Sequence, residues 1–314
     1  MPVDSQLQNI LDLVNAQPTQ EWTVENAADF RKVFDTMVMM LGEGPGSVTA
    51  ENLTVPGPGG EIPIRVFRPE GVERPPILVF FHGGGFVIGS IATHDRECRF
   101  LAEGAGALVV SVDYRLAPEH PAPAASDDCL AALRWVADHA DELGADGGRI
   151  AVAGDSAGGN LAAVTSIRAR DEGGPALAFQ LLVYPVVDMT PTMENPTYDS
   201  MLENAEGYFL TLDDMLFFSD CYLPEGVDRS HHHLSPIHAE SLAGLPPALV
   251  LTCGYDPLRD QGVAYAKALA DAGVEVAHSN YEGGIHAVMS MAAVTDIGRR
   301  FMDEAIAAVR GALH

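Results

Sequence analysis

The chain has 314 residues, of which 47% are hydrophobic and 20% charged, a composition typical of a globular protein with a hydrophobic core. Its 44 acidic and 18 basic side chains give a formal net charge of −26, which argues against a nucleic acid partner because a phosphate backbone would be repelled. No apolar stretch approaches the ~20 residues of a transmembrane helix, and the first residues lack the pattern of a signal peptide, so we expect no membrane span and a cytoplasmic location.

Two stretches have helical patterns that stand apart from the rest of the chain. Residues 1–45 read as two helices, and the second carries one apolar stripe made of Val24, Ala27, Phe30, Phe34, Met37, Val38 and Leu41. Residues 186–235 are rich in Met, Tyr and Phe and interrupt an otherwise regular series of strands and helices. We interpret both stretches as a helical cap over the carboxyl edge of a sheet, where ligands bind in open α/β folds. The alternative is that both stretches are peripheral helices with no role in covering a ligand site.

Strand-like runs recur through residues 46–185 and 236–314, which we predict to form one catalytic core. They are Glu51–Val55, Ile62–Phe67, Ile77–His82, Ala107–Asp113, Arg149–Ala153, Phe179–Tyr184, Ala248–Cys253 and Val274–Tyr281. The first two alternate in polarity and indicate an antiparallel edge, whereas the later runs are apolar throughout, which indicates burial on both faces. Helical patterns follow most strands from residue 77 onward. The sequence therefore predicts an α/β protein with an eight-stranded, mostly parallel central sheet and helices on both faces.

A glycine run, His82-Gly83-Gly84-Gly85-Phe86, follows the third strand. Glycines leave backbone N–H groups exposed and able to approach a substrate oxygen, and such donors stabilise a tetrahedral intermediate by roughly 3 kcal/mol each. The run is not a phosphate loop, because no Gly-Lys-Ser/Thr follows it. A flexible glycine turn is the alternative interpretation, and the serine motif described next makes it less favoured.

The segment Gly154-Asp155-Ser156-Ala157-Gly158 lies between a strand and a helix. G-x-S-x-G in that context is the nucleophile elbow of the α/β-hydrolase fold, in which a tight turn projects the serine at the top of the sheet. The glycines are needed because side chains two positions from the serine would collide with neighbouring backbone. The following helix directs its free N–H groups at the same place. Ser156 as a simple helix N-cap is the alternative.

A serine nucleophile requires a general base, and His286 is the best placed of the eleven histidines. We expect it on a loop of residues 282–286 after the last strand, which returns over the carboxyl edge of the sheet. His278 lies inside that strand and is expected to be structural. The adjacent residues His231–His233 lack the spacing of metal ligands on one face, and we interpret them as polar residues of the cap or of a loop.

The acid that orients the base is expected at the end of the penultimate strand. Asp256 is at that position, in Gly254-Tyr255-Asp256-Pro257. An Asp before Pro is also a common helix N-cap, so this role is open as well. Asp260 is the rival acid, but it would lie inside the following helix.

Together these motifs resemble the bacterial hormone-sensitive-lipase-like esterases (family IV). The resemblance rests on His82–Phe86, the elbow Gly154–Gly159, the segment Asp256–Asp260 and the late His286, and a further family segment matches Tyr114–Glu119. It covers residues 50–290. The family commonly has Gly and then Phe after the histidine, whereas Ala287, Val288 and Met289 follow here.

The resemblance implies an α/β-hydrolase core with a helical cap, hydrolysis of short-chain esters, and no cofactor. It implies a triad of Ser156, Asp256 and His286, and an oxyanion hole made by the N–H groups of Gly83, Gly84 and Ala157. For the substrate pocket we expect Phe86 and Asp155 beside the nucleophile, with walls supplied by the cap residues Phe34, Met37, Phe209 and Phe217.

The sequence thus predicts a serine carboxylester hydrolase whose partner is a small-molecule ester and which forms an acyl-enzyme intermediate. We expect no metal, because the dense histidine cluster lacks ligand spacing and the four cysteines form no zinc or redox motif. A homodimer is compatible with the sequence. The open alternatives are an amidase or a longer-chain lipase on the same scaffold, and a receptor-like ligand-binding protein, which the presence of all three triad members disfavours.

Overall fold

The computed structural model of the chain describes residues 1–17, 22–39, 41–192 and 195–314. The strands are β1 Thr49–Gly57, β2 Gly60–Arg68, β3 Pro76–Phe81, β4 Leu108–Val112, β5 Asp146–Asp155, β6 Phe179–Val183, β7 Ala248–Tyr255 and β8 Val276–Ile285. The helices of the described residues are α1 Ser5–Asn15, α2 Ala27–Met39, α3 Asp95–Ala105, α4 Ala124–Asp138, α5 Ala157–Asp171, α6 Asp199–Glu203, α7 Leu212–Tyr222, α8 Arg259–Asp271 and α9 Asp296–Leu313, with short 3-10 turns η1 Val24–Asn26, η2 Pro236–His238 and η3 Val288–Met291.

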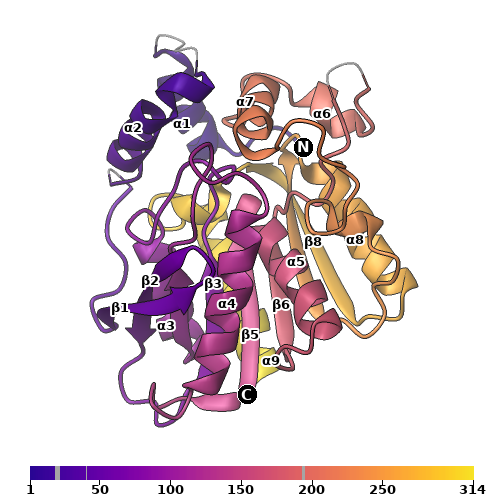
Figure 1. The fold of residues 1–314 in the computed structure, drawn as a ribbon. Helices are drawn as coiled ribbons and strands as arrows, with labels where there is room; N and C mark the ends of the chain where they lie inside the picture. Colours follow the sequence, from indigo (N-terminus) through magenta and orange to yellow (C-terminus); the bar gives the residue numbers. More distant parts are fainter. Residues whose placement is uncertain (18–21, 40, 193–194) are drawn as a thin grey trace.

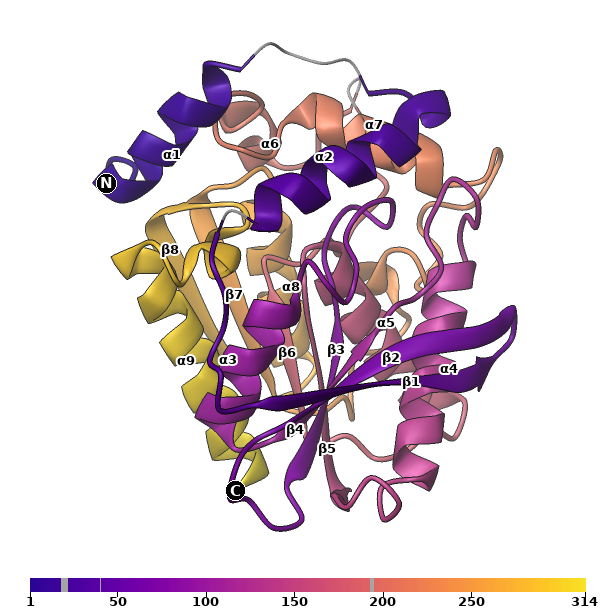
Figure 2. The same ribbon diagram turned by 90° about the vertical axis from the view of Figure 1, so that its left-hand side faces the viewer.

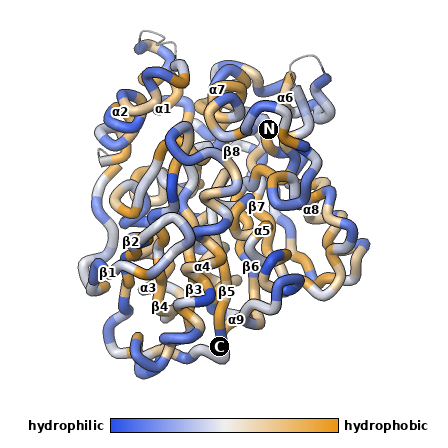
Figure 3. Tube along the Cα trace, viewed as in Figure 1, coloured by the Kyte–Doolittle hydropathy of each residue, from blue (hydrophilic) through white to orange (hydrophobic). Residues whose placement is uncertain are grey.

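The strands form one eight-stranded sheet in the order β1-β2-β4-β3-β5-β6-β7-β8 (Figure 1). β1 pairs antiparallel with β2, and β2 antiparallel with β4, whereas all pairs from β4 to β8 are parallel. The predicted antiparallel edge and parallel centre are therefore confirmed. The tube coloured by hydropathy shows the central strands as largely hydrophobic segments (Figure 3), as expected for strands that are covered on both faces.

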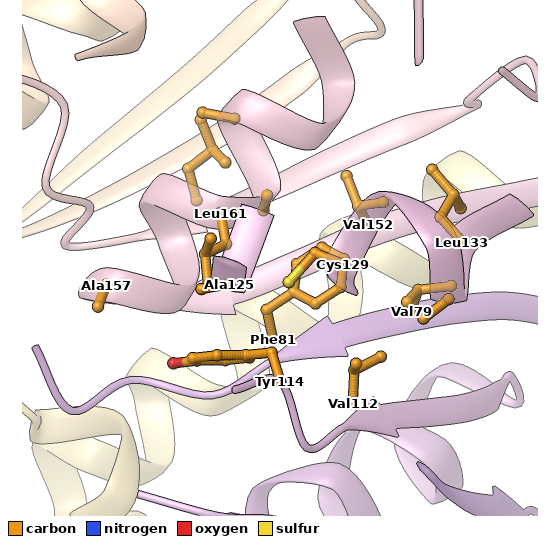
Figure 4. Close-up of a cluster of buried hydrophobic side chains, with 14 of the residues drawn as sticks. Val79, Phe81, Val112, Tyr114, Ala125, Cys129, Leu133, Val152, Ala157 and Leu161 are labelled. Carbon is orange, nitrogen blue, oxygen red and sulfur yellow. The ribbon is translucent and has the colours of Figure 1, made fainter. Parts of the chain in front are cut away.

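Helices cover both faces of this sheet and enclose two hydrophobic cores. α4, α5 and α8 contribute to one core, and α3 and α9 contribute to the other (Figure 2). Figure 4 shows part of the first core, in which Cys129 and Leu133 of α4 and Leu161 of α5 lie over the strand residues Val79 and Val152. This packing fixes β3, β5 and α5, the elements that carry the glycine run and the elbow.

The helices α1, α2, α6 and α7 lie together at one end of the molecule (Figures 1 and 2). The first pair comes from residues 1–45 and the second pair from residues 186–235. The two groups are in contact, because the Asn15 side-chain amide donates to the Gly207 carbonyl at 3.2 Å. Arg31 of α2 anchors the first group to the core, donating to the carbonyls of Val87 at 2.6 Å and Ala117 at 2.7 Å.

One predicted boundary is wrong. Residues 282–285 were expected in a loop, but β8 continues through Ile285, which pairs with Tyr255. The reason is that β7 also extends beyond Cys253, with a register shift before Tyr255. Gly254 permits this, because a Cβ at that position would collide with the carbonyl oxygen of Glu282. His286 therefore follows directly on a strand rather than lying in a loop.

Candidate active site

Ser156 lies on a strained turn between β5 and α5. Its backbone angles are φ 55° and ψ −117°, a positive-φ conformation that a non-glycine residue adopts at a cost of roughly 1–3 kcal/mol. The turn requires glycine on both sides: an added Cβ at Gly154 would collide with the Gly158 carbonyl, and one at Gly158 with the Phe81 carbonyl. Ser156 occupies the N-cap position of α5, yet its side chain makes no capping hydrogen bond. The hydroxyl is therefore available for other partners.

The structure brings Ser156, His286 and Asp256 together from the ends of β5, β8 and β7. The Nε2 atom of His286 lies 3.0 Å from Ser156 Oγ, and its Nδ1 atom lies 2.8 Å from Asp256 Oδ2. All three residues are buried. Because Nδ1 faces a carboxylate, that nitrogen carries the proton in the neutral ring, which leaves Nε2 as the acceptor for the serine hydroxyl.

Asp256 takes the orienting position and is not the N-cap of α8, which is Leu258. Its Oδ2 faces His286, while its Oδ1 accepts the Leu258 N–H at 2.8 Å in the turn that leads into α8. The rival Asp260 does not reach the histidine. It pairs with Arg259 at 2.8 Å and accepts the Ser200 N–H at 2.8 Å.

The residue after the histidine departs from the pattern of the resembled family, and the structure gives the physical consequence. Ala287 has φ 64°, in the left-handed region that favours glycine. Alanine can occupy it at a cost of roughly 1 kcal/mol or more. With Ala287 there, the His286 ring still contacts both Ser156 and Asp256, and its centroid lies 4.6 Å from that of the Tyr184 ring.

The glycine run differs from the prediction at one residue. The Gly83 N–H donates to Asp155 Oδ1 at 2.8 Å, so it is not free to bind a substrate oxygen. The next two residues have positive φ, 117° for Gly84 and 59° for Gly85. Across the described ranges, neither their N–H groups nor that of Ala157 has a hydrogen-bond acceptor. The free donors beside Ser156 are thus those of Gly84, Gly85 and Ala157.

A pocket of about 330 Å³ opens above Ser156 and His286. Of the predicted wall residues, Phe34, Met37, Phe86 and Phe209 line it. Phe217 does not; it is buried, with its ring centroid 5.8 Å from that of Phe30, and its neighbour Phe218 lines the pocket instead. The sequence also missed several apolar lining residues: Trp22, Phe30, Met215 and Tyr222.

Asp155 lies at the pocket as expected, but its carboxylate contacts other residues of the protein and is not free to bind a substrate. It accepts the Gly83 N–H and lies 3.3 Å from Nε2 of His94. His94 also lines the pocket and was not identified from the sequence. His94 immediately precedes α3 and belongs to no recognisable sequence motif, so the sequence offered no reason to select it.

The backbone before the glycine run is fixed by His82. Burial lowers the pKa of its imidazole to about 3, so the ring is neutral at physiological pH. Its Nδ1 lies 2.8 Å from the Gly83 carbonyl, and its ring stacks on Tyr114 with centroids 4.3 Å apart. The Tyr114 hydroxyl donates to the His82 carbonyl at 2.7 Å. These contacts hold the start of the glycine run before any substrate arrives.

No cluster of three or more His, Cys, Asp or Glu side chains in the described ranges is arranged to hold a metal ion. The helices of those same ranges include none that is long and apolar enough to cross a membrane.

Comparisons with known proteins place the chain among relatives of the same fold. A family model described as the alpha/beta hydrolase fold matches residues 78–290. Esterase LipI of Mycobacterium tuberculosis is 46% identical over 267 residues, covering 84% of this chain and 82% of the relative. Carboxylesterase NlhH of the same species is 48% identical over 260 residues, covering 81% and 79%. The solved structure of a hyperthermophilic esterase from the archaeon Pyrobaculum calidifontis is similar with a TM-score of 0.90 at 43% identity, covering 99% of each chain.

Proposed function

The chain belongs to the hormone-sensitive-lipase-like esterases of the α/β-hydrolase superfamily, and on that premise we propose which of its residues carry the reaction. It is a serine carboxylester hydrolase that acts on small-molecule esters. The proposed triad is Ser156 as nucleophile, His286 as general base and Asp256 as the orienting acid. The observation that carries this proposal is the continuous contact from Ser156 Oγ through the His286 ring to the Asp256 carboxylate.

The reaction proceeds in two acyl transfers. Ser156 Oγ attacks the ester carbonyl carbon while His286 Nε2 takes the hydroxyl proton, and Asp256 stabilises the imidazolium that forms. The tetrahedral intermediate collapses when His286 returns the proton to the leaving alkoxide, which gives the alcohol and an acyl-Ser156 ester. Water then attacks the acyl carbon with His286 again as base, and the carboxylic acid leaves with Ser156 restored.

We assign the oxyanion hole to the N–H groups of Gly84, Gly85 and Ala157. This replaces Gly83 in the initial assignment, because its N–H already has an acceptor in Asp155. Ala157 is the first residue of α5, so the positive end of the helix dipole adds to its N–H. Each donor directed at the developing oxyanion is worth roughly 3 kcal/mol in the transition state.

We further propose that residues 1–45 and 186–235 act as a cap that restricts the acyl group to short chains. Support comes from the pocket walls, since Phe34 and Met37 of α2 and Phe218 of α7 line the space above Ser156. Each methylene that fits contributes ~0.8 kcal/mol of transfer energy, but one that does not fit must stay in water or displace the cap.

The cytoplasmic location and the homodimer stay predictions. Cell fractionation would test the location, and light scattering would test the oligomeric state.

The test of the nucleophile is Ser156→Ala with hydrolysis of p-nitrophenyl butyrate as the readout. We expect kcat to fall by about 10⁴-fold or more with an unchanged circular dichroism spectrum. Ser166→Ala is the control: it removes a serine of α5, the helix that follows Ser156, whose hydroxyl bonds only the Ala162 carbonyl among the described residues, and it should keep normal kcat. A folded Ser156→Ala protein with near-normal turnover would end the proposal.

A further inference from the structure

A buried ion pair lies directly behind the glycine run. His94 Nε2 is 3.3 Å from Asp155 Oδ1, and the two side chains are only 5% and 7% exposed. The same Oδ1 atom accepts the Gly83 N–H at 2.8 Å. Because Asp155 immediately precedes Ser156, one carboxylate oxygen connects the nucleophile turn, the glycine run and His94.

The contacts of the His94 ring fit a doubly protonated imidazole. The hydroxyl of Thr93 lies 2.9 Å from His94 Nδ1. That hydroxyl donates its single proton to the Ser90 carbonyl at 2.9 Å and accepts the Ser90 N–H at 2.8 Å. With its proton on the Ser90 carbonyl, this hydroxyl accepts from His94 Nδ1, an arrangement that fits a protonated Nδ1. Nε2 faces the Asp155 carboxylate, which stabilises a proton there as well, so the contacts fit an imidazolium.

The charged groups around the ring agree with this state. Burial by itself lowers the pKa of His94, but the Asp155 carboxylate and then Glu97 of α3 outweigh it, so the pKa is raised. The other titratable neighbour is His82, whose ring lies 5.5 Å away and is neutral. Glu97 is in turn held by Arg96 at 3.0 Å. Burial raises the pKa of the Asp155 carboxyl, but the charge of His94 outweighs it and lowers that pKa. His94 therefore keeps the buried Asp155 carboxylate ionised.

We propose that His94, as an imidazolium paired with Asp155, is a positioning residue for the oxyanion-binding loop. The inference rests on the proposed function and extends it to a residue that does not touch the reacting atoms. An ionised Asp155 accepts the Gly83 N–H in a charge-assisted hydrogen bond, which is about twice as strong as a neutral one. That bond fixes the His82–Gly83 peptide at the start of the run, and the direction of the Gly84 and Gly85 N–H groups that follow depends on it. These donors act where charge develops, so their loss affects the transition state more than substrate binding.

The kinetic test is His94→Gln, assayed with p-nitrophenyl butyrate. We expect kcat to fall by about 10- to 100-fold with KM within about twofold, because the loop is displaced rather than a substrate contact removed. Asp155→Asn, which keeps an oxygen acceptor but removes the charge, should change kcat in the same direction. His278→Gln is the control: it alters an exposed histidine of β8 that contacts Thr252 outside the pocket, and its kinetics should match the parent protein.

Two further measurements separate this inference from the identity of the nucleophile. Titration with diethyl p-nitrophenyl phosphate should release one p-nitrophenol per chain from His94→Gln, which shows that Ser156 is still competent. Nuclear magnetic resonance of the parent protein with 15N-labelled histidine should show both His94 ring nitrogens protonated at pH 7.5, and this holds even if the variants fail to fold. Unchanged kcat in His94→Gln, a loss confined to KM, or a singly protonated His94 ring would overturn the inference.

Discussion

Replacing Asp256 by Asn separates its catalytic role from its role in the turn before α8. The amide oxygen can still accept the Leu258 N–H, which Asp256 Oδ1 accepts at 2.8 Å. The amide NH₂ group would then face His286 Nδ1, where the carboxylate oxygen now lies at 2.8 Å. A donor there favours the tautomer with the proton on Nε2, and that tautomer cannot accept the Ser156 proton. A wrong tautomer of this kind costs ~10⁴ in kcat, or about 5 kcal/mol at 1.36 kcal/mol per factor of ten.

The assay compares Asp256→Asn with Asp260→Asn, by steady-state kinetics on p-nitrophenyl butyrate and by urea denaturation. Asp260 loses only its bonds to Arg259 and Ser200, so its variant should keep kcat within about twofold. Asp256→Asn should unfold at a urea concentration close to that of the parent, because the Asn side-chain oxygen can still accept the Leu258 N–H in the turn before α8. Equal and mild kinetic losses in both variants would refute the assignment of the acid.

Two further predictions concern the cap. The first concerns kcat/KM for p-nitrophenyl esters from C4 to C16, measured below micelle concentrations. We expect a peak at about C4 to C6, because the pocket walls from α2 and α7 limit the length of acyl chain that can be buried. A rise to C12 or C16 would instead indicate a lipase with a mobile lid. The second concerns Glu119, whose hydrogen bonds to Arg31 of α2 lower its pKa from 4.5 to about 2. A depressed carboxyl pKa contributes stability above pH 4.5 that is lost as the pH falls through 2, so Glu119→Gln should be less stable than the parent to urea at pH 6 and equally stable at pH 2. The difference should be small because Glu119 is half exposed, and an equal difference at both pH values would contradict the role of its charge.

The sequence predicted the parts of the site that depend on short-range chain geometry. The strand–turn–helix context around Ser156 is local, and the glycines at positions 154 and 158 are required by collisions within five residues and with the neighbouring strand. The apolar runs likewise predicted the parallel centre of the sheet, because burial on both faces leaves a continuous pattern. Asp256 and His286 could be located because parallel strands end at the same edge.

The residues that were assigned wrongly or missed depend on backbone and helix orientations, which the sequence pattern does not reveal. Whether Gly83 or Gly85 directs its N–H into the pocket depends on backbone angles and on the acceptor that Asp155 provides. Phe217 and Phe218 are adjacent on α7, and helix rotation alone decides that the second lines the pocket. His94 reaches Asp155 only through the packing of α3 against the sheet, a contact between residues 61 positions apart in the chain.

The most direct test of the central claim is to locate the covalent intermediate. The protein is treated with diethyl p-nitrophenyl phosphate, digested, and its peptides are analysed by mass spectrometry. The account predicts one diethylphosphoryl group per chain on Ser156, formed in parallel with the loss of esterase activity, and none in Ser156→Ala. Complete inactivation with the modification on another residue, or with Ser156 unmodified, would contradict it.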